Sequence, residues 1–208
     1  MPNMATMLAF VFSDLQVDVI TLERQLTDVV SKSFNRITVD GDTSTNDACM
    51  LVASGKGIVF EELQAADQEL YLAAVRELFQ ELAMDLIRDA EGGTKFITVN
   101  VTGGRNRQEC LAVAYALAES PLVKTSLFAS DPNWGRILAA VGRAEVEHLD
   151  VSGVSIRLGK LSLIENGELS ASYSELQGKQ QVDKTDIEIS VELGRGSHAE
   201  TDWTSELS

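Results

Sequence analysis

The sequence has few of the side chains from which most enzyme sites are built. It holds only two histidines, His148 and His198, and two cysteines, Cys49 and Cys110. It therefore offers no Cys/His metal-binding cluster and no CxxC pair. A GxSxG elbow, a Walker loop and an HExxH motif are also absent. Both histidines stand among acidic or polar residues, which predicts surface positions. A Ser-His-Asp site is hard to build from this sequence, and no metal is expected.

Positive charge and long apolar runs are also scarce. The 208 residues carry 17 Lys and Arg against 32 Asp and Glu, and the net charge of −15 disfavours nucleic acid as a partner. No apolar run approaches the roughly 20 residues that cross a bilayer, so no membrane segment is expected. We also expect no secretory signal. The two cysteines are far apart and flanked by apolar residues, which indicates reduced, packed thiols and a cytoplasmic protein.

The apolar residues that are present alternate between strand and helix periods. Strands are expected at 7–14, 48–55, 94–103 and 186–194. Helices are expected at 21–34, with Thr21 as the N-cap, and from about 67 to 89. The expected apolar stripe of the second helix is Tyr71, Val75, Leu78, Leu82 and Leu86.

Turn and helix-boundary signals complete this assignment. Pro121 is expected to stop a helix at 107–120, and Asp131-Pro132 to cap and begin another. Asn166-Gly167 indicates a hairpin, and the polar stretch 175–184 is expected to be a surface loop. With no internal repeat and no long linker, the sequence predicts an α/β or α+β fold in which layered sheets are covered by helices.

A threonine near the start becomes a candidate nucleophile because the usual partners are missing. Thr6 lies in "MPNMATML", directly before an apolar strand. A hydroxyl can use its own α-amine as the base once the preceding peptide bond is cut, since a free α-amine has a pKa of about 7.7–8.0. Ala5 is small and leaves room for attack on its carbonyl. A structural threonine fits the same residues, so both interpretations stay open here.

Several stretches in order carry a family resemblance. They are "PNMATML", "NRITVDGDTSTND", "DAEGGTKFITV", "SPLVKTSLFASDPNWGR" and "LAAVGRA", followed by "VELGRG" and "WTSELS". Together they resemble the ArgJ family of ornithine acetyltransferases, also called glutamate N-acetyltransferases. The resemblance implies a DmpA/ArgJ-like fold of the N-terminal-nucleophile type and a precursor that cuts itself between Ala5 and Thr6. Residues 1–5 would be the tail of the upstream half. Residues 6–208 would be the beta-chain region, one domain that needs the alpha half.

The same resemblance implies the chemistry. Thr6 would take the acetyl group of N2-acetyl-L-ornithine and pass it to L-glutamate through an acetyl-threonine ester. Glu91 in "DAEGG" matches the family's substrate-binding glutamate, and a carboxylate suits an amino-acid ammonium. The alternative for Glu91 is a solvated carboxylate after a helix. The resemblance implies no cofactor, acetyl-CoA as an additional donor in some members, and a heterotetramer of upstream and downstream chains.

Other residues keep two interpretations each. "DGDTSTND" either supports the strand after Thr6 or contacts the site, and Lys124 either binds a carboxylate or snorkels at a strand end, which we favour. Trp134 is expected to pack.

The family's oxyanion-hole Thr-Gly pair, with a substrate-binding threonine and lysine, belongs to the upstream half. An Asn and a Ser/Thr that contact substrate lie beyond "WTSELS". Two other functions therefore stay open: a related N-terminal-nucleophile aminopeptidase or hydrolase, and an inactive fragment that lacks the alpha half.

Overall fold

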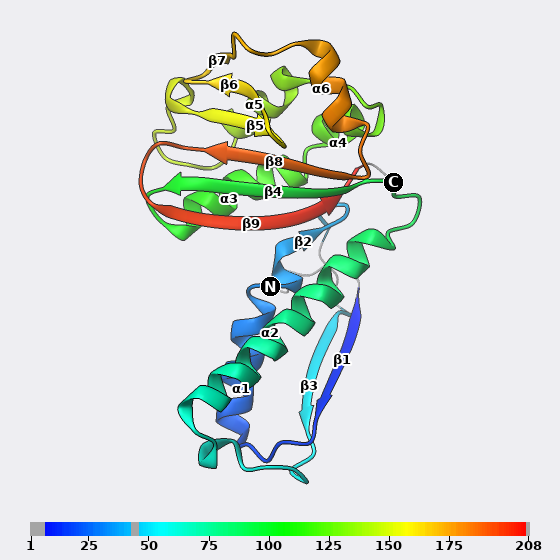
Figure 1. Cartoon of the computed structure of the whole chain (residues 1–208), viewed down its shortest axis with the longest axis vertical. Coiled ribbons are helices and arrows are strands. Elements are labelled where there is room, and N and C mark those ends of the chain that lie inside the picture. Colours follow the sequence, from blue (N-terminus) through cyan, green and yellow to red (C-terminus); the bar gives the residue numbers. More distant parts are fainter. Residues whose placement is uncertain (1–6, 43–45, 207–208) are drawn as a thin grey trace. The chain divides into compact units, whose positions relative to one another are not determined.

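A computed structural model of the chain describes residues 7–42 and 46–206. The chain divides into two compact units (Figure 1). Unit 1 is formed by Met1–Ile37 and Asp42–Leu86, and unit 2 by Thr38–Gly41 and Ile87–Ser208. No linker or shift in composition marks this division in the sequence. The expectation of one domain over 6–208 stays a prediction, because the compactness of each unit does not test whether either unit folds alone.

Unit 1 combines a two-stranded parallel sheet with two helices. Strand β1 (Leu8–Ser13) pairs with β3 (Ala48–Ala53), which confirms both predicted strands. Helix α1 spans Val19–Val30, and α2 (Ala65–Arg88) belongs to unit 1 through Leu86. Short 3-10 turns occur at Phe34–Arg36 and Phe60–Glu62. The Asp18 carboxylate accepts the N–H groups of Ile20 and Thr21, so Asp18, and not Thr21, is the N-cap of α1.

The buried side of α2 shares Val75 with the predicted stripe but differs from it further along the helix. Leu78 and Leu86 are 41% and 40% exposed. Each is followed by a second apolar residue, and it is this second residue that is buried. The buried set is Val75, Phe79, Ala83 and Ile87. Phe79 packs edge-to-face on Phe34, with 5.8 Å between the ring centroids, and both side chains are fully buried. The helix was predicted correctly and Val75 is buried as predicted, but the predictions for Leu78 and Leu86 were wrong.

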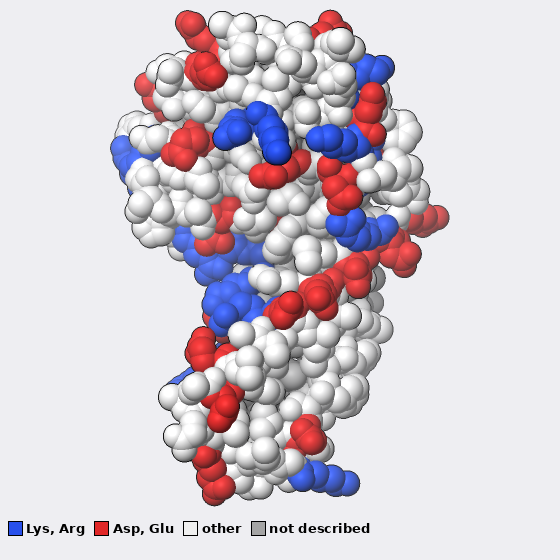
Figure 2. Space-filling model, in the orientation of Figure 1, with Lys and Arg blue, Asp and Glu red and all other residues white. Residues whose placement is uncertain are grey.

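The outward side of α2 is acidic. Glu77, Glu81 and Asp85 are exposed at four-residue spacing. Figure 2 shows a line of acidic side chains over this helix. Like charges at this spacing destabilise a helix slightly. Burial of the opposite side, and not surface charge, therefore holds α2 in place.

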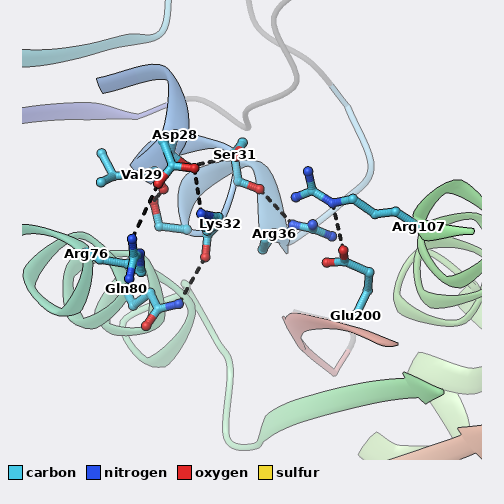
Figure 3. A network of polar contacts seen from close by, with 10 residues as sticks. Asp28, Val29, Ser31, Lys32, Arg36, Arg76, Gln80, Arg107 and Glu200 are labelled. Carbon is cyan, nitrogen blue, oxygen red and sulfur yellow. Dashed lines mark hydrogen bonds and ion pairs between the residues drawn. The ribbon is translucent and has the colours of Figure 1, made fainter. Parts of the chain in front are cut away.

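Polar contacts also join α1 to α2 within unit 1 (Figure 3). Lys32, just after α1, forms an ion pair with Asp28 at 2.6 Å, and its carbonyl accepts a hydrogen bond from Gln80 Nε2 at 3.3 Å. Arg76 Nη2 lies 3.7 Å from an Asp28 oxygen. These side chains are partly exposed, so each ion pair contributes only about 0.2–1 kcal/mol. Their contribution to the stability of unit 1 is therefore small.

Unit 2 is built on a seven-stranded mixed sheet. Its strand order is β2-β9-β4-β8-β5-β6-β7. The strands span Ile37–Thr38 (β2), Phe96–Gly104 (β4), Ser155–Leu158 (β5), Leu161–Glu165 (β6), Glu168–Leu169 (β7), Asp186–Glu192 (β8) and His198–Ser205 (β9). β4 runs parallel to β8 and antiparallel to β9. Asn166 and Gly167 have φ of +51° and +77°, as the predicted hairpin between β6 and β7 requires.

The two faces of this sheet differ in chemistry. Alternate residues of β4 and β8, including Ile97, Val99 and Ile189, are buried in one apolar core with the helices of unit 2. On the other face, Asn100 donates to Glu188 at 2.9 Å and accepts from Thr201 at 2.8 Å. This alternation is typical of a sheet with one packed and one polar face. It confirms the predicted strands at 94–103 and 186–194, and with them the α/β class.

The helices of unit 2 begin where side chains cap them. They are α3 (Arg107–Ala118), α4 (Pro121–Phe128), α5 (Trp134–Gly142) and α6 (Glu175–Val182). Pro121 follows α3 as predicted, but it is also the first residue of α4, which Ser120 caps. The cap of α5 is Asn133, whose side chain accepts the Arg136 N–H, and not Asp131.

The predicted loop at 175–184 is wrong, because most of it forms α6. Gly178 lets α6 pack closely, since a Cβ there would lie 2.9 Å from Pro132. Tertiary packing therefore orders a segment whose polar composition favours a loop.

In the part of the chain that the structure describes, no helix is long and apolar enough to cross a membrane.

The buried side of α2 gives the first prediction. Phe79→Ala should lower the free energy of unfolding by about 3–5 kcal/mol, because it leaves a cavity beside Phe34. Leu78→Ala on the exposed side should cost clearly less. Urea unfolding of the two variants beside the parent chain measures this. Equal losses for the two variants would contradict the phase of α2.

Candidate active site

The predicted nucleophile, Thr6, and the Ala5 before it lie outside the described residues. The next residue, Met7, is held from two sides within unit 1. Its N–H donates to Asp47 Oδ1 at 3.0 Å, and its carbonyl accepts the Ala48 N–H at 3.2 Å. The other Asp47 oxygen, Oδ2, is buried without a hydrogen-bond partner. The described part of "DGDTSTND" thus supports the strand that follows Thr6, while residues 43–45 lie outside the described residues.

Glu91 lies in unit 2, in the turn between α2 and β4. The turn is closed by the Gly93 N–H, which donates to the Ala90 carbonyl at 2.9 Å. Gly92 has a φ of +76°, in the left-handed region that favours glycine. The Glu91 side chain is exposed, so a ligand can reach its carboxylate. Met7 belongs to unit 1 and Glu91 to unit 2.

A buried carboxylate holds the residues that follow Glu91. Glu206 is fully buried, and its Oε1 accepts the Thr94 N–H at 2.5 Å and the Thr94 hydroxyl at 2.7 Å. Its Oε2 accepts the Lys95 N–H at 2.7 Å. Burial alone would raise the pKa of Glu206, but these hydrogen bonds outweigh it and lower the pKa below the usual value. Glu206 therefore stays ionised at neutral pH.

Two lysine amines lie around the same region, Lys124 buried and Lys95 half-buried. Lys124, on α4, is 4% exposed and donates to the Ser205 carbonyl at 2.6 Å and to Thr204 Oγ1 at 3.0 Å. The prediction that Lys124 snorkels at a strand end is therefore wrong. Lys95 Nζ donates to Ser130 Oγ and to the Val182 carbonyl, each at 2.8 Å. Burial lowers the pKa of Lys124 to about 8, although the carboxylates of Glu206, Asp40 and Glu119 oppose this shift.

A small cavity adjoins the Glu91 turn. It measures about 140 Å³ and is lined in part by Gly93, Thr94 and Asp186. On its wall, the Arg88 guanidinium lies 4.0 Å from the centroid of the Phe96 ring and pairs with Asp186 at 2.6 Å. Two larger hollows, of about 380 and 360 Å³, lie on the exposed side of β5 and β8. Neither of these is lined by Glu91 or Met7.

The remaining candidates are placed as follows. His148 and His198 are both exposed, as predicted. Cys49 and Cys110 are free thiols, and Cys110 is fully buried. Trp134 is 38% exposed and lines a hollow with Tyr173. Within residues 7–42 and 46–206, no cluster of three His, Cys, Asp or Glu side chains could hold a metal ion.

Sequence reasoning missed Glu206 and misread Lys124. Glu206 reaches Thr94 across 112 residues of sequence, so no local pattern reveals the contact. The sequence prediction for Lys124 did not include helix α4. On this helix the Lys124 side chain points inward and reaches the end of β9. The family motif "WTSELS", which contains Glu206, is the only signal for this carboxylate in the sequence.

Comparisons with known proteins agree on one family. The profile of the ArgJ family matches residues 1–208. The protein named "Arginine biosynthesis bifunctional protein ArgJ" from Pseudomonas fluorescens (strain Pf0-1) is 52% identical over 210 residues. Its namesake from Pseudomonas syringae pv. tomato is 50% identical over 217 residues. Each alignment covers 100% of this chain and 52% of the relative, so the chain spans about half the length of these curated relatives.

A solved structure has the same fold. The crystal structure of arginine biosynthesis bifunctional protein argJ from Bacillus halodurans superposes with a TM-score of 0.89 at 35% identity. The match covers 98% of this chain and 95% of that one. The ArgJ-like fold expected from the sequence is thereby confirmed.

The buried Lys124 amine gives the second prediction. Its folded-state pKa lies below the usual lysine value, so the folded chain binds fewer protons than the unfolded chain between these two values. The stability of the parent relative to Lys124→Met should therefore rise with pH, by about 1–2 kcal/mol between pH 7.5 and 9.5. Urea unfolding of both chains across this range measures the difference. A difference that falls with pH, or stays constant, would contradict a depressed pKa.

Proposed function

This chain belongs to the ArgJ family, and on that premise we propose that it is the nucleophile-bearing half of a bifunctional acetyltransferase of arginine biosynthesis. The observation that carries the proposal is the family match over all 208 residues, together with about 50% identity to relatives of that name. The reaction would move an acetyl group from N2-acetyl-L-ornithine to L-glutamate. Since both substrates are small and soluble, we propose a cytoplasmic location. We also propose that no organic cofactor takes part, because the transfer needs only a hydroxyl, an amine and hydrogen-bond donors.

The first step we propose is self-cleavage before Thr6. The Thr6 hydroxyl attacks the Ala5 carbonyl carbon, and the Ala5 acyl group moves from nitrogen to oxygen. Water then hydrolyses this ester, which leaves a carboxylate on Ala5 and a free α-amine on Thr6. The Met7 amide, held by Asp47 and Ala48, supports this step because it fixes the peptide on the far side of Thr6.

Acetyl transfer then runs in two halves through the same oxygen. The Thr6 α-amine takes the hydroxyl proton while the oxygen attacks the acetyl carbonyl of N2-acetyl-L-ornithine. The tetrahedral intermediate collapses, and the proton passes to the departing amine of ornithine. The amine of glutamate next attacks the acetyl-threonine ester, which releases N-acetylglutamate and restores Thr6. Acetyl-CoA would enter as an alternative donor at the first half.

Glu91 is proposed as the contact for an ammonium group of the amino-acid substrate. Its carboxylate is exposed and sits on a turn whose shape is fixed by Gly92 and by Glu206. A carboxylate of this kind binds an ammonium through charge-assisted hydrogen bonds. The oxyanion donors would come from the upstream half, and without them the rate should fall by about 10²–10³.

A surface of unit 1 supports an obligate partner. On one side of the β1–β3 sheet the apolar side chains are exposed, and Phe12 is 72% exposed. Phe10 lies opposite Met50, and Phe12 opposite Val52. The members of this apolar sheet face are Leu8, Phe10, Phe12, Met50 and Val52. The other side, which includes Ala9, Val11 and Leu51, is buried.

Parallel sheets occur almost only with both faces covered, and a two-stranded sheet is marginal alone. No further strand among the described residues pairs with β1 or β3. We propose that the upstream half of the precursor covers this apolar sheet face and that the two halves assemble into a heterotetramer. The relatives, which are about twice as long as this chain, contain the additional length that such a partner needs.

The third prediction tests the function directly. In a chimera, residues 1–208 replace the matching region of the Pseudomonas fluorescens relative, so that the remaining half is supplied. The chimera should cut itself before Thr6 and should form N-acetylglutamate from N2-acetyl-ornithine and glutamate. Thr6→Ala should abolish both activities, whereas Thr6→Ser should retain part of each because a hydroxyl remains. Intact mass and chromatography of the amino acids measure them.

Three outcomes would contradict this proposal. Release of free acetate without transfer to glutamate would indicate a hydrolase of the N-terminal-nucleophile type. An uncut, inactive chimera beside an active parent relative would indicate an inert chain. Full activity of Thr6→Ala would remove Thr6 from the chemistry.

The fourth prediction concerns the apolar sheet face. Phe10→Glu combined with Phe12→Glu should reduce co-purification of this chain with the upstream half of the Pseudomonas fluorescens relative at least tenfold, because burying two carboxylates against apolar surface is costly. Leu176→Glu, at an equally exposed leucine on α6, is the matched control and should leave co-purification unchanged. Equal recovery of both variants would show that the partner binds elsewhere.

A further inference from the structure

The end of β9 reaches the turn that carries Glu91. Glu206 accepts three hydrogen bonds from Thr94 and Lys95, the two residues that directly follow the Gly92-Gly93 pair. Gly93 also approaches β9, since a Cβ at Gly93 would lie 3.7 Å from Ser205 Cβ. The C-terminal end of the segment from Glu91 to Lys95 is thus fixed by one buried carboxylate.

The carboxylate itself is held rigidly. The carbonyl of the preceding residue, Ser205, accepts a hydrogen bond of 2.6 Å from the buried Lys124 amine. Lys95 is held in turn by the Ser130 hydroxyl and the Val182 carbonyl. The positive charges of Lys95 and Lys124 interact favourably with Glu206. Two cations thus compensate a buried anion that would otherwise be costly.

The chemistry of this contact requires a carboxylate. Both oxygens of Glu206 accept hydrogen bonds, with two donors on Oε1 and one on Oε2. A glutamine there could accept on one atom only, because its NH2 group would face the Lys95 N–H as a second donor. A turn of two glycines needs an external support to hold one conformation, since glycine loses the most freedom on ordering.

We propose that Glu206 is a positioning residue for Glu91 and that it acts by fixing the Thr94–Lys95 peptide so that the Glu91 carboxylate meets the substrate ammonium. This inference rests on the proposed function, in which Glu91 contacts substrate. Glu206 is too buried to touch the substrate itself. Lys124 belongs to the same support, since it anchors the strand end from which Glu206 projects.

The fifth prediction uses steady-state kinetics of the chimera described above. Glu206→Gln should raise the KM for N2-acetyl-ornithine about tenfold, the loss expected when a hydrogen bond to a charged group is disturbed, and should change kcat much less. Thr94→Val, which removes only the hydroxyl donor, should raise the KM in the same direction by a smaller factor. Glu200→Gln is the matched control. Glu200 lies on the same strand and pairs with Arg107 at 2.7 Å (Figure 3). The KM of the Glu200→Gln chimera should equal that of the parent.

A double-mutant cycle separates positioning from general damage. If Glu206 acts through Glu91, Glu206→Gln should raise the KM no further in a Glu91→Ala background. An unchanged KM for Glu206→Gln, or the same fold-increase with and without Glu91, would overturn the proposal. A fall in kcat for Glu206→Gln without any rise in KM would also overturn it, because it would indicate a role in the chemical step.

A second measurement stands apart from activity. In hydrogen exchange of the chain, the peptide covering 89–96 should exchange faster in Glu206→Gln than in the parent, whereas Glu200→Gln should match the parent. Unchanged exchange of this peptide would overturn the support by Glu206 even if the chimera is active. If the 89–96 peptide exchanges faster in Glu206→Gln but the chimera without this substitution is inactive, the support by Glu206 is upheld while the proposed acetyl transfer fails.

Discussion

The pairing of β4 with β9 is the constraint on which unit 2 depends. Its register places Phe96 opposite Ser205, so the end of β9 arrives beside the start of β4. Glu206 follows directly and meets Thr94 and Lys95, although more than a hundred residues of chain separate them. A slip of one residue would move every side chain of β9 to the other face. It would place Glu206 away from the turn and leave the Lys124 amine without the Ser205 carbonyl.

The same strand pairing connects packing to chemistry. On one face, β4 contributes Ile97, Val99 and Val101 to the main core, which makes its position rigid. At its start it carries the Glu91 turn, whose carboxylate remains exposed. A rigid strand with a short, supported turn is a suitable base for a substrate contact, because small displacements of a binding group are costly to catalysis. Unit 1 differs, since apolar side chains on one face of its parallel sheet are exposed, and this is the face that we propose the upstream half covers.

The strands were the most predictable part of the fold. Alternation of apolar and polar residues in "TKFITVNVTG" and "DIEISVELG" located β4 and β8, and the Asn166-Gly167 pair located the hairpin. The failures have local physical reasons. In α2, adjacent apolar residues such as Leu78-Phe79 satisfy two helical phases, and only packing against Phe34 selects one. In α6, a polar sequence is ordered by contacts of Gly178 with Pro132 and Tyr173, which sequence periodicity does not register.

The candidate site was predictable only where motifs carry it. The motif "DAEGG" identified Glu91, and the motif "PNMATML" identified Thr6 and Ala5. Thr6 and Ala5 lie outside the described residues, and the roles of all three residues stay predictions. Glu206 and Lys124 depend on contacts across 80 or more residues, so single-sequence reasoning did not assign them.

The central claim is that the oxygen of Thr6 carries the acetyl group between the two substrates. It is tested most directly by peptide mass spectrometry of the chimera after brief incubation with N2-acetyl-ornithine in the absence of glutamate. The account predicts one acetyl group on the peptide that begins with Thr6, and its loss as N-acetylglutamate forms when glutamate is added. Transfer to glutamate while this peptide never becomes acetylated, or acetylation at a different residue that is then passed to glutamate, would contradict it.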